Sequence, residues 1–319
     1  MAISEFEILL NKYIEDWFTK IELPSEPANL YNPINYTMQS GGKRIRPTLL
    51  LASLMAFGGD IDYACWPCRA IEMFHNFTLV HDDVMDESPT RRGRPTVHSR
   101  WDENTAILSG DTMLTLAEEY LCRCSDKHLR PVIEVFNRTA IEVYEGQQLD
   151  MDFEKRDEVS VEEYLTMIRL KTSVLLGCAL KIGAILANAK PTDADTLYNF
   201  GIALGIGFQL RDDYLDTFGS PEIFGKPIGG DIIRDKKTWL MIKCRQILEN
   251  NLQIPGEKDS DKVDRIRNLY IKQGLDKEIL QLISEYSNTA LSYLDKLNIT
   301  PESRQYFEEL VTRLMYRDK

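Results

Sequence analysis

Apolar residues recur at intervals of three and four along almost the whole chain, which is the pattern of amphipathic helices. The pattern is clearest at residues 47–58, 64–86, 105–123, 161–189 and 195–216. No pair of alternating β-branched runs flanks an Asn-Gly or Asp-Gly turn, so no β-hairpin is expected. The sequence therefore predicts an all-α protein.

Proline and glycine residues fall between the helical runs, where they are expected to end or begin helices. No linker rich in serine, glycine or proline interrupts the chain, so we expect residues 1–319 to form a single domain. The glycine-rich segment 218–232 is predicted to be a flexible loop, and the region from about Cys244 onward is predicted to form packing helices without chemistry of its own. The expected helix boundaries are Pro33, Gly58-Gly59, Pro89, Pro191, Gly219–Pro221, Pro227–Gly230, Pro255 and Pro301.

The net charge restricts the partners that the whole surface can attract. The chain has 38 basic and 50 acidic residues, a net charge of −12. This balance disfavours broad binding to nucleic acid or to anionic membranes. No apolar run approaches the roughly 18 residues of a membrane-spanning helix, so stable membrane insertion is not expected. The N-terminal segment carries acidic residues and resembles neither a secretory signal nor a transit peptide.

Six cysteines raise the question of redox or metal chemistry. The CWPC stretch at Cys65–Cys68 has the spacing of a redox pair or of half a zinc site. It lacks the surrounding βαβ pattern of a thioredoxin-like motif, and the CRC stretch at Cys122–Cys124 does not have zinc-ligand spacing. We therefore expect reduced, structural cysteines in a cytoplasmic protein.

Two clusters of aspartates stand at the ends of predicted helices. Asp82 and Asp86 lie one helical turn apart, on one face, and Asp83 is about 100° away. Asp212, Asp213 and Asp216 repeat this arrangement. Carboxylates four residues apart repel each other, and the negative end of the helix dipole adds to the repulsion. A solvated acidic helix end is the alternative, but the residues that lead into each cluster belong to apolar faces.

A hard divalent cation would remove this electrostatic conflict. Magnesium binds a few carboxylates and completes its shell with water and substrate phosphate oxygens. A calcium loop does not fit, because the D-x-D-x-D-G spacing is absent. Basic residues suited to phosphate occur in several separate stretches, including GGKRIRP at the start of a predicted helix and the TRRGRP turn after the first cluster. Together, these features suggest a site for magnesium-bridged diphosphate.

The motifs GGKRIRP, LVHDDVMDESPTRRGRPTVH, GDTML, KTSVLLGCAL, GFQLRDDYLD and GKPIGGDIIRDKKTW occur in this order. With this series the chain resembles the trans-isoprenyl diphosphate synthases, which include farnesyl and geranylgeranyl diphosphate synthases. The resemblance implies an antiparallel helical bundle around a deep central cavity, usually a homodimer. It also implies that an allylic diphosphate ionises and is attacked by the double bond of isopentenyl diphosphate.

The resemblance further implies a role for individual residues. Three magnesium ions would be held by the two aspartate motifs, with Asp82, Asp86 and Asp212 as direct ligands. Asp83, Asp213 and Asp216 would act nearby or through water. Isopentenyl diphosphate would contact Lys43, Arg46, His75 and Arg92. The allylic diphosphate would contact Arg91, Lys171, Gln209, Lys226 and Lys236, with Thr172 close to the reacting carbons.

His75 departs from the family pattern, because many relatives have glutamine there. A lone histidine in an apolar run is more commonly a core or surface residue. However, His75 precedes Asp82 by seven residues, which places both on nearly the same face of the helix. Apolar residues such as Phe77, Leu79 and Phe208 would shield the carbocation from water.

Product length is the least determined part of the prediction. In this family the positions four and five residues before the first motif, here Thr78 and Phe77, help to form the floor of the tail cavity. Phe74 could also limit the tail, and both phenylalanines could instead be ordinary core residues. One aromatic residue without an insertion in the motif favours geranylgeranyl diphosphate as the product, with farnesyl diphosphate as the alternative.

Two further classes of protein remain as alternatives. A class I terpene cyclase would carry a second metal motif of another type and would not need the GGKRIRP stretch. A noncatalytic subunit of a prenyl synthase would typically lack one of the motifs, and none is missing here.

Overall fold

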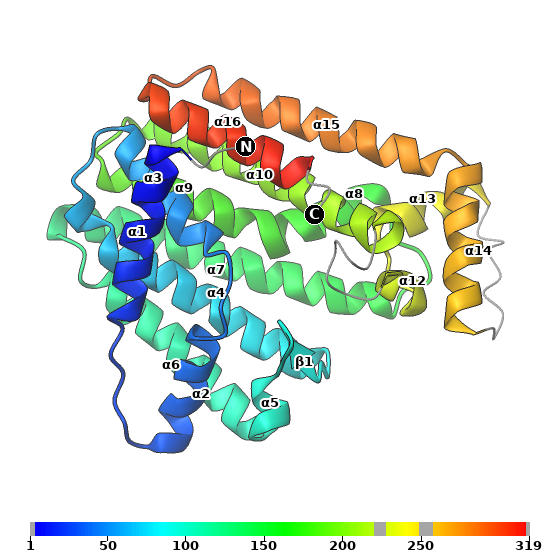
Figure 1. Ribbon diagram of the computed structural model, residues 1–319, viewed down its shortest axis with the longest axis horizontal. Helices are drawn as coiled ribbons and strands as arrows, with labels where there is room; N and C mark the ends of the chain where they lie inside the picture. The colour runs from blue at the N-terminus through cyan, green and yellow to red at the C-terminus, as the bar shows by residue number, and fades with distance from the viewer. Residues whose placement is uncertain (1–3, 220–227, 249–257, 317–319) are drawn as a thin grey trace. The chain divides into compact units, whose positions relative to one another are not determined.

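The computed structural model describes residues 4–219, 228–248 and 258–316. These residues are mostly α-helical, which confirms the all-α prediction (Figure 1). The internal contacts divide the chain into two compact units. Unit 1 comprises Met1–Phe136, Ala179–Ala194 and Ile299–Ser303, and unit 2 comprises Asn137–Cys178, Asp195–Asn298 and Arg304–Lys319. The expectation of a single domain over residues 1–319 stays a prediction.

Unit 1 is organised around α4, whose buried positions include Ile71, Met73 and Phe74. Helix α6 packs along α4, and α2, α3 and α5 make further contacts with this pair (Figure 1). Burial of such apolar faces contributes roughly 25 cal/mol per Å² of apolar surface and fixes the orientation of α4. The helices that lie wholly in unit 1 are α1 (Glu5–Thr19), α2 (Ala28–Met38), α3 (Ile45–Ala56), α4 (Cys65–Met85), α5 (Val97–Arg100) and α6 (Glu103–Leu121), with a 3-10 turn at Ile61–Tyr63.

Four helices contribute residues to both units. They are α7 (Asp126–Glu154), α9 (Val174–Leu186), α10 (Pro191–Phe218) and α16 (Pro301–Met315). Proline is the first residue of both α10 and α16, as predicted, because its missing N–H has no partner in the first turn of a helix. Pro33 does not break the chain as expected: it lies inside α2, where the helix tolerates the loss of one backbone hydrogen bond.

Unit 2 contains the second aspartate cluster and most of the C-terminal helices. Its remaining elements are α8 (Val161–Ile168), a π-helical turn (Arg169–Ser173), α12 (Gly230–Ile233), α13 (Trp239–Ile247), α14 (Asp259–Lys272) and α15 (Leu275–Leu294). Helix α14 contacts α12, α13 and α15, and Phe200 of α10 packs against Phe307 of α16 with ring centroids 5.4 Å apart and ring planes tilted by 60°. The expected helices after Cys244 are therefore present, although residues 249–257 lie outside the described residues.

A short hairpin follows α4, which corrects the expectation that no hairpin would form. Strand β1 (Thr90–Arg91) pairs antiparallel with β2 (Arg94–Pro95), with Arg91 opposite Arg94. The two residues between the strands, Arg92 and Gly93, both have positive φ angles, 52° and 72°. Two-residue hairpin turns of this kind usually begin with asparagine, aspartate or glycine. Because this turn begins with arginine, the sequence pattern did not predict it.

The cysteines differ in their exposure: Cys68, Cys178 and Cys244 are buried, and Cys122 is exposed. All six are free. Cys68 of the CWPC stretch is buried, and burial raises the pKa of its thiol well above the usual value. A thiol with a raised pKa is a poor nucleophile and a poor metal ligand. Among the helices that the structure describes, none is both long and apolar enough to cross a membrane.

Candidate active site

The first aspartate cluster lies at the C-terminal end of α4, as the sequence predicted. The helix ends at Met85, and the backbone N–H of the capping residue Asp86 donates to the carbonyl of Asp82 at 2.8 Å. Asp83 turns to the protein interior and accepts a hydrogen bond from Nε of Arg91 at 2.8 Å. Burial raises the pKa of Asp83, and Arg91 opposes this shift. The hairpin therefore brings Arg91 back onto the aspartate motif.

Basic residues of unit 1 gather near the start of α3. Arg46 donates from Nη1 to Nε2 of His75 at 3.0 Å, and Arg92 donates to the carbonyl of Gly41. Burial and the neighbouring Arg46, Arg92 and Arg91 lower the pKa of His75 well below its usual value, so the imidazole is neutral at pH 7. With Nε2 as acceptor, Nδ1 of the neutral ring carries the proton and is a donor. Lys43 is exposed on the loop before α3.

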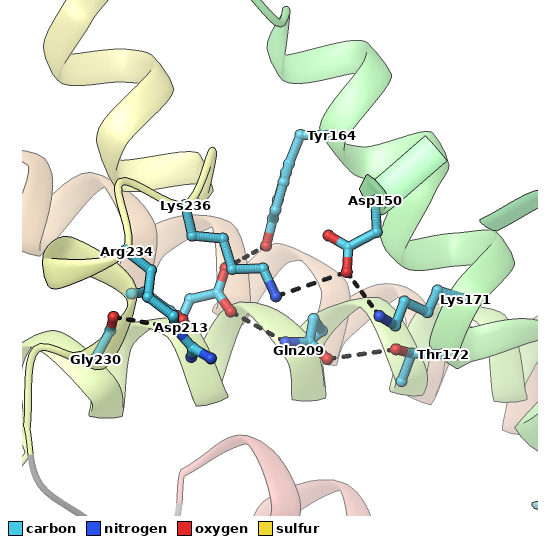
Figure 2. Close-up of polar contacts among 10 residues, drawn as sticks. Asp150, Tyr164, Lys171, Thr172, Gln209, Asp213, Gly230, Arg234 and Lys236 are labelled. Carbon is cyan, nitrogen blue, oxygen red and sulfur yellow. Dashed lines mark hydrogen bonds and ion pairs between the residues drawn. The ribbon is translucent and has the colours of Figure 1, made fainter. Parts of the chain in front are cut away.

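The second cluster lies near the end of α10 in unit 2. Asp213 is buried and accepts hydrogen bonds from the hydroxyl of Tyr164 and, at 3.0 Å, from Nε2 of Gln209 (Figure 2). Asp216 accepts a hydrogen bond from the backbone N–H of Asp231 at 3.0 Å. Burial and the nearby charge of Asp231 raise the pKa of Asp213 to about 7 and that of Asp216 to about 6. The ionised forms of both carboxylates are therefore disfavoured, and a bound cation would favour them.

Two lysines of unit 2 converge on one carboxylate. The ammonium of Lys171 lies 2.6 Å from Oδ2 of Asp150, and that of Lys236 lies 3.8 Å from the same oxygen (Figure 2). Although burial opposes ionisation of Asp150 most strongly, Lys236 and Lys171 hold its pKa below the usual value. Asp150 thus fixes two residues, one from the π-helical turn and one from the segment after α12, that the sequence assigned to the same diphosphate.

The π-helical turn presents Lys171 and Thr172. The hydroxyl of Thr172 donates to Oε1 of Gln209 on α10 at 3.3 Å. A Cβ atom added to Gly146 of α7 would lie 2.3 Å from the backbone nitrogen of Lys171, and one added to Gly205 of α10 would lie 2.6 Å from atoms of Ser173. Both glycines therefore allow neighbouring helices to approach the turn closely. Single π-helical turns of this kind occur frequently at functional sites.

The structure groups most of the predicted residues within each unit. In unit 2, Lys171 and Lys236 both pair with Asp150, and Thr172, Gln209 and Asp213 form a separate chain of hydrogen bonds. Lys226 lies outside the described residues. Sequence reasoning missed several members of these clusters, because each is a single polar residue within an otherwise ordinary helix or loop. These members are Asp150, Tyr164 and Asp231.

The aspartates present the hard oxygen donors that magnesium prefers. Within the described residues, no group of three or more histidine, cysteine, aspartate or glutamate side chains is arranged to hold a metal ion. Asp83, Asp213 and Asp216 are instead tied to protein donors. Carboxylate oxygens at two helix ends suit a cation that completes its shell with water and phosphate oxygens, so the chemistry of the donor set fits magnesium.

The three residues assigned to product length occupy different environments on α4. Phe74 and Phe77 are 0% and 5% exposed, with ring centroids 5.6 Å apart. The ring centroid of Phe74 also lies 5.1 Å from that of Phe136, and the ring centroid of Phe77 lies 4.8 Å from that of His81. Thr78 is half-buried, and its hydroxyl donates to the carbonyl of His75 at 2.8 Å. Both phenylalanines thus pack in the core of unit 1, whatever further role they have.

Comparison with known proteins identifies the family. The polyprenyl synthetase family model matches residues 27–271. A geranylgeranyl pyrophosphate synthase of Geoglobus acetivorans is 38% identical over 97% of this chain and 96% of its own length. A geranylgeranyl diphosphate synthase of Methanosarcina mazei is 37% identical over 79% of this chain and 84% of its own length.

Solved structures agree with the sequence comparison. A crystal structure of a geranylgeranyl pyrophosphate synthase superposes with a TM-score of 0.90 at 41% identity, covering 100% of both chains. A likeness over complete chains at this identity confirms the predicted isoprenoid synthase fold. The ordered motifs, the two aspartate clusters at helix ends and these comparisons lead to one conclusion: the chain belongs to the polyprenyl synthetase family.

Proposed function

We propose that this protein is a magnesium-dependent prenyltransferase that condenses isopentenyl diphosphate with allylic diphosphates, head to tail in the 1′-4 sense. The main product would be geranylgeranyl diphosphate. The observation that carries the proposal is the pairing of each aspartate cluster with a basic residue: Arg91 bonds to Asp83, and the charge of Lys236 opposes the raised pKa of Asp213. The similarity to proteins named geranylgeranyl diphosphate synthases supports the choice of product.

We assign magnesium to Asp82, Asp86 and Asp212, with three ions per active site. When bound, magnesium would neutralise the charge that develops on the departing pyrophosphate. Asp83, Asp213 and Asp216 would act nearby or through water, in agreement with their hydrogen bonds to protein donors. Their raised pKa values are consistent with a place beside a cation, which favours the ionised form.

The remaining charged residues would bind and orient the two diphosphates. Lys43, Arg46, His75 and Arg92 are assigned to isopentenyl diphosphate. Arg91, Lys171, Gln209, Lys226 and Lys236 are assigned to the allylic diphosphate. Because Asp150 already orients Lys171 and Lys236, little reorganisation is needed when the charge of the leaving group develops. Thr172 is held by Gln209 and would lie close to the reacting carbons.

Product analysis tests the proposed reaction against its alternatives. Purified protein with magnesium, labelled isopentenyl diphosphate and dimethylallyl or geranyl diphosphate should release geranylgeranyl diphosphate. Farnesyl diphosphate as the end product would favour the alternative synthase. Cyclic hydrocarbon would indicate a terpene cyclase, and the absence of any product would indicate a noncatalytic subunit.

Product length should respond to substitutions on α4. Thr78→Phe places a ring at a half-buried position and should shorten the main product towards farnesyl diphosphate. Phe77→Ala should lengthen the product, because a removed ring opens space that the protein only partly refills, and it should also cost about 3 kcal/mol of stability. Mass spectrometry of products from folded variants is the measurement. If both variants give the same product lengths as the wild type, or if the wild type makes products of eight or more isoprene units, other residues set the length.

We further propose that the protein acts as a homodimer in the cytoplasm. Ile107 and Leu108 of α6 are 42% and 59% exposed, and adjacent exposed apolar side chains suit a surface covered in an assembly. Light scattering at micromolar concentration should give the mass of a dimer. An active monomer would contradict this assignment.

A further inference from the structure

The hairpin that carries Arg91 and Arg92 is held against the C-terminal end of α2. Nη1 of Arg92 donates to the carbonyl of Gly41, and Nη1 of Arg94 donates to the carbonyl of Gln39 at 3.4 Å. The last carbonyls of a helix have no partner within the helix, and the negative end of the helix dipole lies there. The end of α2 and the loop after it therefore offer acceptors to two guanidinium groups of the hairpin.

Tyr36, in the last turn of α2, contacts the second strand of the hairpin. Its hydroxyl donates to the carbonyl of Pro95 at 2.8 Å, and Pro95 is paired with Thr90 on the first strand, directly before Arg91. The guanidinium carbon of Arg94 lies 4.1 Å from the centroid of the Tyr36 ring, in a cation–π contact. One side chain thus bonds to the backbone of the hairpin and packs against one of its arginines.

Two residues after the hairpin fix the ring of Tyr36. The guanidinium carbon of Arg100 lies 4.4 Å from the ring centroid, and the ring of Trp101 meets the tyrosine ring edge-on, with centroids 5.4 Å apart. Tyr36 is half-buried among these groups. Its position is therefore set by Arg94, Arg100 and Trp101, none of which is assigned to a substrate.

Gly42 of the GGKRIRP motif allows Arg92 to approach. A Cβ atom added to Gly42 would lie 2.8 Å from Nη1 of Arg92, and the φ angle of Gly42, 138°, is one that other residues rarely adopt. The motif after α2 and the hairpin after α4 therefore fit each other, although Gly41 and Arg92 are 51 residues apart in sequence. Arg92 is exposed, so its guanidinium is still accessible to a ligand.

Resting on the proposed function, which assigns Arg92 to isopentenyl diphosphate and Arg91 to the allylic diphosphate, we propose that Tyr36 is a positioning residue for both arginines. By holding the backbone at Pro95 and the side chain of Arg94, it fixes the turn that presents Arg92. A cation that is already fixed binds a diphosphate more tightly than a mobile one, because less conformational freedom is lost on binding.

Tyr36→Leu removes the ring and the hydroxyl together. Calorimetry with isopentenyl diphosphate, in metal-free buffer so that the aspartate clusters bind no cation, should give a dissociation constant higher by about tenfold. The kcat/KM for both substrates should fall by about 10–100-fold, the effect of misplaced binding groups. Hydrogen exchange of the backbone amides at residues 90–96 should become faster, because the hairpin opens more readily. Tyr36→Phe removes only the hydroxyl and should raise the dissociation constant by about threefold, the size of one hydrogen bond.

Tyr31→Leu is the matched control. Tyr31 lies five residues earlier on α2, about 140° around the helix from Tyr36, and is half-buried as well. Any loss of melting temperature that the two leucine variants share reports the packing of α2. Binding of isopentenyl diphosphate and hydrogen exchange of the hairpin should be as in the wild type for Tyr31→Leu. Equal changes in these two measurements for both variants overturn the proposal.

A double-mutant cycle tests whether Tyr36 acts through Arg92. Arg92→Ala should weaken binding of isopentenyl diphosphate by itself, and adding Tyr36→Leu should then weaken it little further. Additive losses, or unchanged binding by Tyr36→Leu, overturn the positioning role alone. If Tyr36→Leu does not fold, Tyr36→Phe takes its place, and unchanged binding by that variant overturns the proposal.

The same cycle separates this proposal from the proposed function. If Arg92→Ala binds isopentenyl diphosphate like the wild type, the assigned diphosphate site is wrong, and the role of Tyr36 is overturned with it. If Arg92→Ala weakens binding and Tyr36→Leu does not, the assigned site stands and only the positioning role is wrong.

Discussion

Replacing Asp82 with alanine should lower the turnover number by at least about 10²–10³-fold, the effect of losing one preorganised electrostatic group. Asp82 lies one turn before Asp86 at the C-terminal end of α4, where the helix dipole already disfavours negative charge. The variant should still fold, because removing one of several carboxylates reduces the repulsion among them in the metal-free protein. Steady-state kinetics with saturating magnesium and thermal melting are the measurements.

A neighbouring residue provides the matched control for Asp82. Glu87 is exposed and directly follows the motif, so Glu87→Gln removes the same unit of charge without touching the proposed ligands. It should retain nearly full turnover, whereas Asp82→Asn should be as impaired as Asp82→Ala. A chelator should abolish activity of the wild type, and added magnesium should restore it. Full activity of Asp82→Ala, or indifference to the chelator, is incompatible with the metal assignment.

Helix periodicity and helix-ending residues were sufficient to predict where the aspartate clusters lie. Pro89 and Gly219 follow the clusters within a few residues, and α4 and α10 end at Met85 and Phe218. The sequence signal is strong there because a local rule, that proline and glycine interrupt helices, agrees with the tertiary structure. The same rule failed at Pro33, since packing of α2 in unit 1 outweighs the loss of one hydrogen bond.

The π-helical turn could not be predicted from periodicity. Residues 161–189 read as one amphipathic helix, yet the structure inserts a turn at Arg169–Ser173 between α8 and α9. Most residues in this stretch are apolar, so a shift of one residue in the helical period does not visibly change the pattern. The cause lies in the neighbouring helices, where Gly146 and Gly205 leave room for the turn to approach. These glycines are distant in sequence, so only the fold reveals their relation to Lys171.

Buried charges were the other feature that sequence reasoning missed. Glu72 is buried on α4, and Asp150 is largely buried on α7, with a side chain that is 13% exposed. A charged residue inside an apolar run, such as Glu72 in AIEMFHNF, is a usable signal, because glutamate is rarely buried without a partner. Asp150 gives no comparable signal, since LDMDFE contains a second acidic residue, Asp152, which is exposed.

Replacing Asp150 with asparagine should impair both stability and use of the allylic substrate. The substitution removes the negative charge 2.6 Å from the ammonium of Lys171 and 3.8 Å from that of Lys236, and it leaves two cations to repel each other. Breaking a fully buried pair costs about 3–5 kcal/mol. The Asp150 and Lys171 side chains are 13% and 23% exposed, so we expect a smaller loss of about 2 kcal/mol.

Both lysines should then lose their fixed positions, which should lower kcat/KM for the allylic diphosphate by about 10–100-fold. The Michaelis constant for isopentenyl diphosphate should change much less. Asp152→Asn is the matched control, because Asp152 lies on the same helix but is exposed. It accepts a hydrogen bond from Gln148. Equal effects of the two variants would contradict the role of Asp150.

The pH dependence gives an independent test of the same carboxylate. The pKa of Asp150 is lowered in the folded protein, so its ionised form stabilises the fold above the ordinary aspartate pKa of about 4. The difference in free energy of unfolding between wild type and Asp150→Asn should therefore be complete above about pH 4 and shrink as the pH falls further. Urea unfolding at a series of pH values measures it. A difference that stays constant through this range would mean that Asp150 stabilises the protein by packing rather than by its charge.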